Sequence, residues 1–201
     1  MSKERLYIFD TTLRDGAQTQ GVDFSVDDKL KIATALDNLG VDYIEGGWPG
    51  ANPTDTEFFQ KKHTFTNSKL TSFGMTKKTG RSAENDPGLS ALLNSNTPAV
   101  CLVGKSWDFH VDIALGISNE ENLENISEST KHFIKKKKEF IFDAEHFFDG
   151  YKANSKYALS CLKAAFDQGA HWIVLCDTNG GTLPHEITNI VSEVSKVIPG
   201  E

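Results

Sequence analysis

Short apolar segments alternate with amphipathic segments along the whole chain. The apolar segments are rich in branched and aromatic side chains, and most carry apolar residues at both odd and even positions. This pattern is typical of parallel strands that are buried on both faces. The expected strands are residues 6–9, 42–46, 70–74, 99–104, 140–145 and 172–177.

The segments between these strands carry helix signals. One helix is expected from Ser25, a favourable N-cap, to Gly40, a residue type that suits the left-handed position after a helix. Another is expected to begin at Ser118, which forms a capping box with Glu121, and to end near Ile134.

Two later helices show an apolar stripe at helical spacing. Residues 154–169 form the first, and residues 184–198 form the second, with Pro184 in its first turn. Residues 54–62 and 88–95 carry fewer helix signals. The positions expected to be buried are Tyr157, Ala158, Cys161, Leu162, Ala165 and Phe166 in the first stripe, and Ile187, Ile190, Val191, Val194 and Ile198 in the second.

Six βα units in succession predict an α/β fold with a parallel sheet and helices outside it. An open doubly wound sheet and a closed (β/α)8 TIM barrel both fit. The first strand is not followed by G-x-G-x-x-G, which weakens the dinucleotide-binding version of the open sheet. A barrel has eight strands and typically about 250 residues. As a barrel, this chain of 201 residues would carry about the first six βα units.

The composition is that of a globular protein with a substantial core, with 38% hydrophobic and 24% charged residues. A net charge of −7 and a pI of about 5.4 argue against a nucleic-acid partner. No apolar run approaches the ~18 residues of a membrane helix, and the N-terminus lacks the apolar stretch of a secretory signal. We therefore expect a cytoplasmic protein without a membrane partner.

Three cysteines, Cys101, Cys161 and Cys176, have apolar neighbours and no C-x-x-C spacing. They are expected to be reduced core residues rather than nucleophiles, in agreement with a cytoplasmic setting. The basic run Lys135–Lys138 falls where a helix should end and is interpreted as a solvated last turn.

Charged groups gather directly after the expected strands. Asp10, Arg14 and Asp15 follow the first strand, Glu45 lies at the end of the second and Glu145 at the end of the fifth. Active sites of parallel α/β folds form at the carboxyl ends of the strands, so in a barrel these groups would meet in one mouth. A buried carboxylate needs a partner charge, a proton or a metal. Arg14 is a natural partner, and Asp15 is a natural ligand for a hard cation.

The polar groups at the strand ends also have structural interpretations: the cap of a turn, a solvated acidic loop or a surface turn. The groups concerned are Asp10, Thr11, Thr12 and Asp177 as caps; Asp143, Glu145, His146 and Asp149 as an acidic loop that also suits a metal; and Lys105, Asp108 and His110 as a surface turn. Their convergence on one end of the sheet favours a functional site.

Several stretches together resemble a known enzyme family. "TTLRDG" after the first strand is similar to the metallolyase barrel superfamily of isopropylmalate and homocitrate synthases and hydroxymethylglutaryl-CoA lyase. "EGGWPG", "DAEHFFDG" and "LCDTNGGTLP" resemble the citramalate synthase branch of that superfamily. The resemblance extends from about residue 5 to the end of the chain and implies the closed barrel.

The resemblance implies an acyltransferase of isoleucine biosynthesis that condenses acetyl-CoA and pyruvate to (R)-citramalate and CoA. It also implies a homodimer and a divalent metal, Mn²⁺ or Mg²⁺, with Zn²⁺ as a further option. In this resemblance Asp15 is a metal ligand, Arg14 binds the keto oxygen of the substrate and Glu45 orients Arg14. Glu145 assists deprotonation of the acetyl-CoA methyl group, and Thr178 binds the carboxylate of the keto acid.

The chain departs from the superfamily in its histidines. In the superfamily, two further metal ligands come from a His-x-His on the seventh strand, and the six histidines here form no such pair. Residues 1–201 are therefore expected to be the N-terminal part of the catalytic barrel, without the seventh and eighth units and the C-terminal regulatory domain. Alone, they are expected to have little or no activity.

Three alternatives stay open. The first is a related synthase or lyase that acts on another 2-oxo acid. The second is an aldolase or a biotin-dependent carboxyltransferase. The third is a non-catalytic partial barrel that pairs with another subunit through its open sheet edges.

Overall fold

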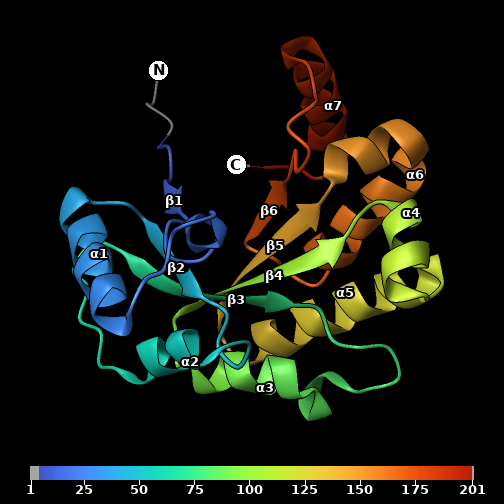
Figure 1. Cartoon of the computed structure of the whole chain (residues 1–201). Coiled ribbons are helices and arrows are strands. Elements are labelled where there is room, and N and C mark those ends of the chain that lie inside the picture. The colour runs from blue at the N-terminus through green and yellow to red at the C-terminus, as the bar shows by residue number, and fades with distance from the viewer. Residues whose placement is uncertain (1–4, 201) are drawn as a thin grey trace. The chain divides into compact units, whose positions relative to one another are not determined.

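The computed structural model describes residues 5–200, so residues 1–4 and 201 of the expected domain lie outside the described part. Across residues 5–200, six strands alternate with helices and follow one another in the sheet in chain order, β1-β2-β3-β4-β5-β6 (Figure 1). The pairs β1–β2, β2–β3 and β5–β6 are parallel. This is the strand order of consecutive βα units of a TIM barrel, as predicted.

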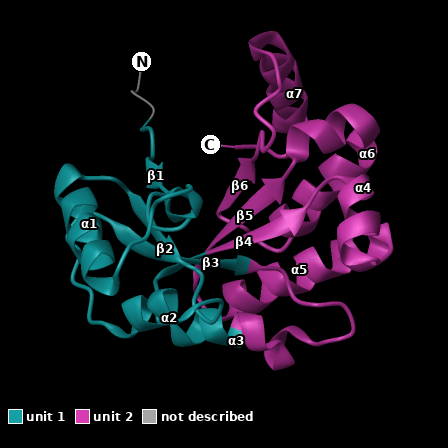
Figure 2. Cartoon of the chain, in the orientation of Figure 1, with its two compact units in different colours: residues 1–74, 90–100 teal, residues 75–89, 101–201 magenta. Residues whose placement is uncertain are grey.

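The described chain divides into two compact units (Figure 2). Unit 1 comprises residues 1–74 and 90–100, and unit 2 comprises residues 75–89 and 101–201. Each unit carries its own core and its own set of strand ends.

Unit 1 is built on β1 (Phe9–Asp10), β2 (Tyr43–Gly47) and β3 (Lys69–Met75). Helices α1 (Val26–Leu39) and α2 (Pro53–Gln60) pack against each other and against β2. The buried side chains at the centre of this unit are Leu13, Ala33, Val41, Ile44, Phe58, Phe59 and Leu70.

The ends of α1 confirm the prediction from the sequence. Ser25 accepts a hydrogen bond from the backbone of Asp28, whose carboxylate accepts one from Ser25 in return. Gly40 ends the helix in the left-handed conformation, with φ 87°. A residue with a Cβ is strained in this conformation, so glycine is the favourable choice there.

The first strand differs from the prediction of residues 6–9. β1 contains only Phe9 and Asp10, and Leu6, Tyr7 and Ile8 are exposed. The carbonyl oxygen of Ile8 accepts backbone hydrogen bonds from Asp42 N and Tyr43 N at 3.0 and 3.1 Å, but the regular strand pairing begins only at Phe9. In the described part of the chain β1 pairs with β2 alone, in the register Phe9 with Tyr43 and Asp10 with Ile44.

Unit 2 holds three strands, β4 (Ala99–Lys105), β5 (Glu139–Glu145) and β6 (Trp172–Leu175), of which Ala99 and Val100 belong to unit 1. The helices are α5 (Asn119–Lys135), which contacts β5, α6 (Phe147–Phe166), which contacts β5 and β6, and α7 (Pro184–Val197), which contacts α6. The core between them includes Leu102, Ile126, Phe140, Phe142 and Leu162.

Shorter helical segments complete the chain. They are η1 (Gly16–Gln18), η2 (Ala83–Asn85), α3 (Pro87–Asn94), α4 (Asp108–His110) and the π-helical η3 (Val111–Leu115). Helices α2 and α3 lie where helices were expected, as does α5 with its capping box between Ser118 and Glu121 and its end at Lys135.

Three expectations for unit 2 were wrong in detail. Strand β6 ends at Leu175 instead of residue 177. Helix α6 begins at Phe147 instead of Asn154, and Asn154 instead forms a kink inside it, with φ −150° and ψ 79°. The Asn154 side chain accepts a hydrogen bond from Tyr157 N at 3.2 Å, so the capping signal in the sequence marks the second half of the helix. The two apolar stripes are buried less completely than predicted: Phe166 and Ile187 are only partly buried and Val191 is 39% exposed, whereas Ile190, Val194 and Ile198 are buried.

Candidate active site

In unit 1, the loop after β1 is a tight turn around the carbonyl oxygen of Thr11. This oxygen accepts hydrogen bonds from the backbone N–H groups of Arg14, Asp15 and Gly16 at 3.1, 2.9 and 3.1 Å. Asp10 caps the turn by accepting bonds from the backbone and the hydroxyl of Thr12. The structural interpretation of Asp10 and Thr12 therefore holds, and the turn presents Arg14 and Asp15 at the carboxyl end of the strand.

The Arg14 guanidinium is held on three sides. Its Nε donates to Glu45 Oε2 at 2.6 Å, and its Nη1 lies 3.1 Å from Asp15 Oδ1. The guanidinium carbon lies 4.0 Å from the centre of the Phe73 ring, a cation–π contact. Glu45 is fully buried, whereas 17% of the Arg14 side chain and 63% of the Asp15 side chain are exposed. A charge-assisted bond to a buried carboxylate fixes the orientation of the arginine.

A cavity of about 320 Å³ lies next to Arg14 in unit 1, with Gln18, Trp48 and Asn52 in its wall. Trp48 packs edge-on against Phe73, with ring centres 5.5 Å apart. Arg14 is itself one of the residues that line this cavity.

The β2–α2 loop that closes this cavity is organised by a buried ion pair between Lys29 and Asp55. Lys29 Nζ also donates to Gly46 O at 2.9 Å, and Asp55 Oδ2 accepts bonds from Trp48 N at 2.8 Å and Asn52 Nδ2 at 3.0 Å. Gly46 follows Glu45 directly, so this network fixes the end of the strand that carries Glu45. The pair could not be predicted from the sequence, because lysine is seldom buried.

In unit 2, Glu145 and Lys105 are the last residues of β5 and β4 and form an ion pair. Ser106, which follows Lys105, donates from its backbone N at 3.3 Å and from its hydroxyl at 2.7 Å to the carbonyl oxygen of Glu145. These bonds fix the two strand ends against each other. Lys105, which the sequence left open as a surface turn, therefore belongs to the surroundings of Glu145.

Thr178 follows β6 and contacts the start of α6. Its Oγ1 accepts a hydrogen bond from His146 N at 2.9 Å. His146 has φ 54°, a left-handed conformation that is uncommon outside glycine and is enriched at functional turns. His146 Nδ1 lies 3.2 Å from Asp149 Oδ2, which also accepts a bond from Asn179 Nδ2 at 3.0 Å. Glu145 thus pairs with Lys105, whereas His146 contacts Asp149. The two neighbouring residues belong to a hydrogen-bonded network and do not form a single cluster of metal ligands.

His110 lies edge-on to His146, with ring centres 4.5 Å apart. The pKa of His110 is lowered, first by burial and then by the positive charges of His146 and Lys105. The neutral imidazole is therefore the favoured form at neutral pH.

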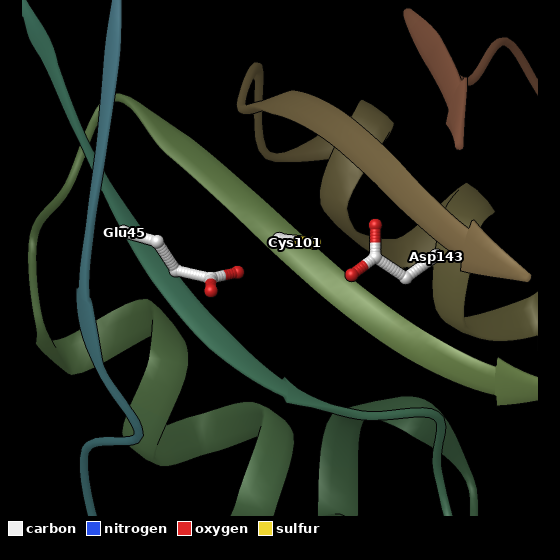
Figure 3. Close-up of side chains that lie close together, drawn as sticks. All are labelled: Glu45, Cys101 and Asp143. Atoms are coloured by element: carbon white, nitrogen blue, oxygen red, sulfur yellow. The ribbon is translucent and has the colours of Figure 1, made fainter. Parts of the chain in front are cut away.

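The cysteines are core residues, as expected, although Cys176 is only partly buried. Burial raises the pKa of the Cys161 thiol to about 12, which keeps it protonated. Figure 3 draws Cys101 on β4 and Asp143 on β5, whose Sγ and carboxylate oxygen lie within 4.8 Å of each other in unit 2. It also draws the buried carboxylate of Glu45 on β2 of unit 1. Two neighbouring donors do not by themselves form a closed metal site.

The structure brings together the predicted residues of each unit separately. Arg14, Asp15 and Glu45 contact one another in unit 1, whereas Glu145 and Thr178 lie at the strand ends of unit 2. The expectation that all of them meet in one mouth, and the role given to each residue, stay predictions.

Comparison with known proteins decides the family. A family profile described as HMGL-like matches residues 5–201. The chain belongs to the HMGL-like family. Within residues 5–200, no helix is both long enough and apolar enough to cross a membrane.

The chain is similar over almost its whole length to enzymes named (R)-citramalate synthase. It is 54% identical to the one from Aquifex aeolicus, over 96% of this chain and 37% of that protein. It is 50% identical to the one from Geobacter sulfurreducens, over 98% of this chain and 38% of that protein. The chain thus spans less than two fifths of the length of these relatives. The resemblance seen in the sequence is confirmed.

Solved structures confirm the barrel fold. Hydroxymethylglutaryl-CoA lyase from Pseudomonas aeruginosa matches with a TM-score of 0.79 at 16% identity, over 97% of this chain and 65% of that chain. A second HMG-CoA lyase, from Acinetobacter baumannii and in complex with coenzyme A and 3-methylmalate, matches with a TM-score of 0.77 at 19% identity, over 96% of this chain and 63% of that chain.

Proposed function

We propose that this chain contributes the first six βα units of an acyltransferase that condenses acetyl-CoA with pyruvate and water to give (R)-citramalate and CoA. The observation that carries the proposal is the difference in identity between two groups of relatives. The relatives named (R)-citramalate synthase are 46–54% identical to this chain, whereas those named 2-isopropylmalate synthase are 31–32% identical. The product belongs to isoleucine biosynthesis, as the resemblance implies.

Arg14 is the group that binds the keto oxygen of pyruvate in this proposal. The attacked carbonyl becomes negatively charged, and a donor that is already oriented stabilises that charge without reorganisation. The bond to Glu45 and the contact with Phe73 supply this orientation. Glu45 is thus a positioning residue, because it acts through Arg14.

Asp15 is the proposed ligand of a divalent metal. Its carboxylate is a hard oxygen donor and is 63% exposed, so it fits Mg²⁺ or Mn²⁺ as one ligand among several. When bound, such a metal supplies Lewis-acid stabilisation to the substrate carbonyl.

Glu145 is the proposed general base. Its carboxylate takes a proton from the methyl group of acetyl-CoA, and the carbon then forms a bond to the keto carbon of pyruvate, whose C=O π bond breaks as the keto oxygen takes up a proton to become the hydroxyl group of the product. Water subsequently cleaves the thioester and releases CoA. Thr178 accepts a bond from His146 N, which leaves its hydroxyl proton to be donated to the carboxylate of pyruvate.

The test is CoA thiol release by the protein in its natural reading frame, with acetyl-CoA, Mn²⁺ or Mg²⁺, and one 2-oxo acid at a time. We expect release with pyruvate but not with 2-oxoisovalerate or 2-oxoglutarate. Arg14→Ala should lower kcat/KM by about 10²–10³-fold, the usual effect of losing one oriented donor. The exposed Arg81 offers a matched control, and Arg81→Ala should leave the rate unchanged.

Other outcomes would redirect the assignment. Release with a larger 2-oxo acid alone would keep the mechanism and change the substrate to that of an isopropylmalate or homocitrate synthase. Absence of release with every acid would favour a lyase or a non-catalytic partial barrel. Assay of residues 1–201 alone tests the prediction that this part has little activity by itself, and gel filtration tests the predicted homodimer.

A further inference from the structure

The ion pair between Lys105 and Glu145 differs from an ordinary surface salt bridge. Only 19% of the Lys105 side chain and 26% of the Glu145 side chain are exposed. Exposed pairs contribute little because two long, mobile side chains must be ordered to form them. Here both residues end buried strands, so most of that ordering comes from the fold.

The backbone of each partner is fixed independently of the ion pair. The carbonyl oxygen of Glu145 accepts two bonds from Ser106, at 3.3 and 2.7 Å. The carbonyl oxygen of Lys105 accepts a bond from Asn122 Nδ2 at 2.8 Å, and Cys161 Sγ lies 3.7 Å from it. Asn122 is itself buried and also donates to Tyr157 Oη at 2.8 Å. Replacing the Lys105 side chain should therefore remove the ammonium and leave these anchors intact.

A cation beside a catalytic base has a specific use when the base removes a proton next to a carbonyl group. As the proton moves to the carboxylate, the negative charge leaves the carboxylate and appears on the thioester oxygen. The methyl carbon and this oxygen are both bonded to the same carbonyl carbon. A group that contacts the base is therefore close to the oxygen that becomes charged.

We propose that Lys105 is a catalytic residue that donates a hydrogen bond from its ammonium group to the thioester oxygen of acetyl-CoA as the enolate forms. This proposal rests on the proposed function, in which Glu145 is the base. The ammonium is the counterion of Glu145 before proton transfer and of the enolate oxygen after it. No charge is left uncompensated at either stage, and the donor is in position before the reaction.

The experiment uses the protein in its natural reading frame with acetyl-CoA and pyruvate. Lys105→Met keeps the length of the side chain and removes the charge, and Lys105→Arg restores a cationic donor. Lys163→Met is the control, because Lys163 forms an exposed pair with Asp167 on α6. Circular dichroism and thermal melting establish that each variant is folded.

We expect Lys105→Met to lower kcat by about 10²–10³-fold with a smaller change in KM, because the lost bond forms only in the transition state. Lys105→Arg should recover at least about tenfold of this loss, since a charge-assisted donor is restored. Acetyl-CoA deuterated at its methyl group should react with Lys105→Met well below the rate of the unlabelled compound, because proton removal is the step that has been slowed.

The proposal would be overturned by a kcat of Lys105→Met within about threefold of the wild type, or by a change in KM alone. A lowered kcat with no isotope effect would also overturn it, because the loss would then lie in another step. If Lys105→Met does not fold, Lys105→Gln, which remains polar but uncharged, decides by the same criteria. Failure of the proposed function is distinguishable, because the wild type itself would then release no thiol, and the role of Lys105 would fall with it.

Discussion

The buried ion pair of unit 1 allows a quantitative test of how the candidate site is held. In Lys29→Met the ammonium is lost, and Asp55, whose side chain is only 11% exposed in the structure, loses its counterion. The Gly46 carbonyl also loses the donor that lies 2.9 Å from it. Removing one partner of a buried pair typically costs about 3–5 kcal/mol, because the remaining charge is desolvated without compensation.

The size of the expected effect on unfolding follows from this cost. In a chain of 150–250 residues, about 1 kcal/mol shifts the melting temperature by about 2–4 °C, so we expect a decrease of roughly 6–20 °C. Asp55→Asn in the Lys29→Met background removes the second charge. The double variant should therefore lose less free energy of unfolding than the two single variants lose in sum, by about 0.5–3 kcal/mol.

The assay is urea unfolding followed by the fluorescence of Trp48. The other two tryptophans, Trp107 and Trp172, belong to unit 2, and replacing both by Phe restricts the signal to unit 1. Lys31→Met is the matched control, because Lys31 is exposed on the same helix and its loss should change the free energy of unfolding by less than about 0.5 kcal/mol.

Two results would refute the reasoning. A loss below about 1 kcal/mol in Lys29→Met would mean that water replaces the ammonium and that the pair is not desolvated. If the double variant loses as much free energy of unfolding as the two single variants lose in sum, the two charges are not coupled.

Two other perturbations test the packing and the charge of single residues. Gly150→Ala should destabilise the chain by about 1–3 kcal/mol, because a Cβ there would lie 2.4 Å from Ser106 O, whereas Gly181→Ala has open space and should be neutral in the same thermal melt. Burial acts to raise the pKa of Asp37, but hydrogen bonds, chiefly from backbone N–H groups of residues 66–68, outweigh it and lower the pKa below 3.8. Asp37 therefore makes its full contribution to the free energy of unfolding above the pKa that it has in the unfolded state. This contribution is lost as the pH falls through the lower pKa of the folded state. The deficit of Asp37→Ala in urea titrations should accordingly shrink as the pH falls below 3.8, and a deficit independent of pH would contradict this.

Much of the fold was determined by local sequence signals. Alternating apolar and amphipathic segments predicted six βα units, and the caps at Ser25, Gly40 and Ser118 lie where the helices begin or end. These signals are readable because a cap acts within a few residues of the chain, and because a strand buried on both faces needs apolar side chains throughout. The charged residues of the candidate site were found for a related reason, since each one interrupts an apolar pattern at a strand end.

The extent of the first strand was decided only by tertiary structure. The apolar run at residues 6–9 predicted a strand, but only Phe9 and Asp10 pair with β2. Strand formation depends on backbone partners that are distant in sequence, and composition does not report them. The same limit applies to the kink of α6 at Asn154, where the Asn154 side chain also donates to Asp108 at 2.7 Å.

The partners of the charged groups were likewise decided by tertiary structure. Lysines are usually exposed, so the sequence alone assigned Lys29 no role and left Lys105 as a surface turn. Folding buries Lys29 against Asp55 and brings Lys105 to Glu145, residues that are 26 and 40 positions away in the chain. By itself the sequence determined which residue types stand at the strand ends. The packing of helices and strands decided which charge faces which, because the cost of a buried charge depends on the groups that surround it.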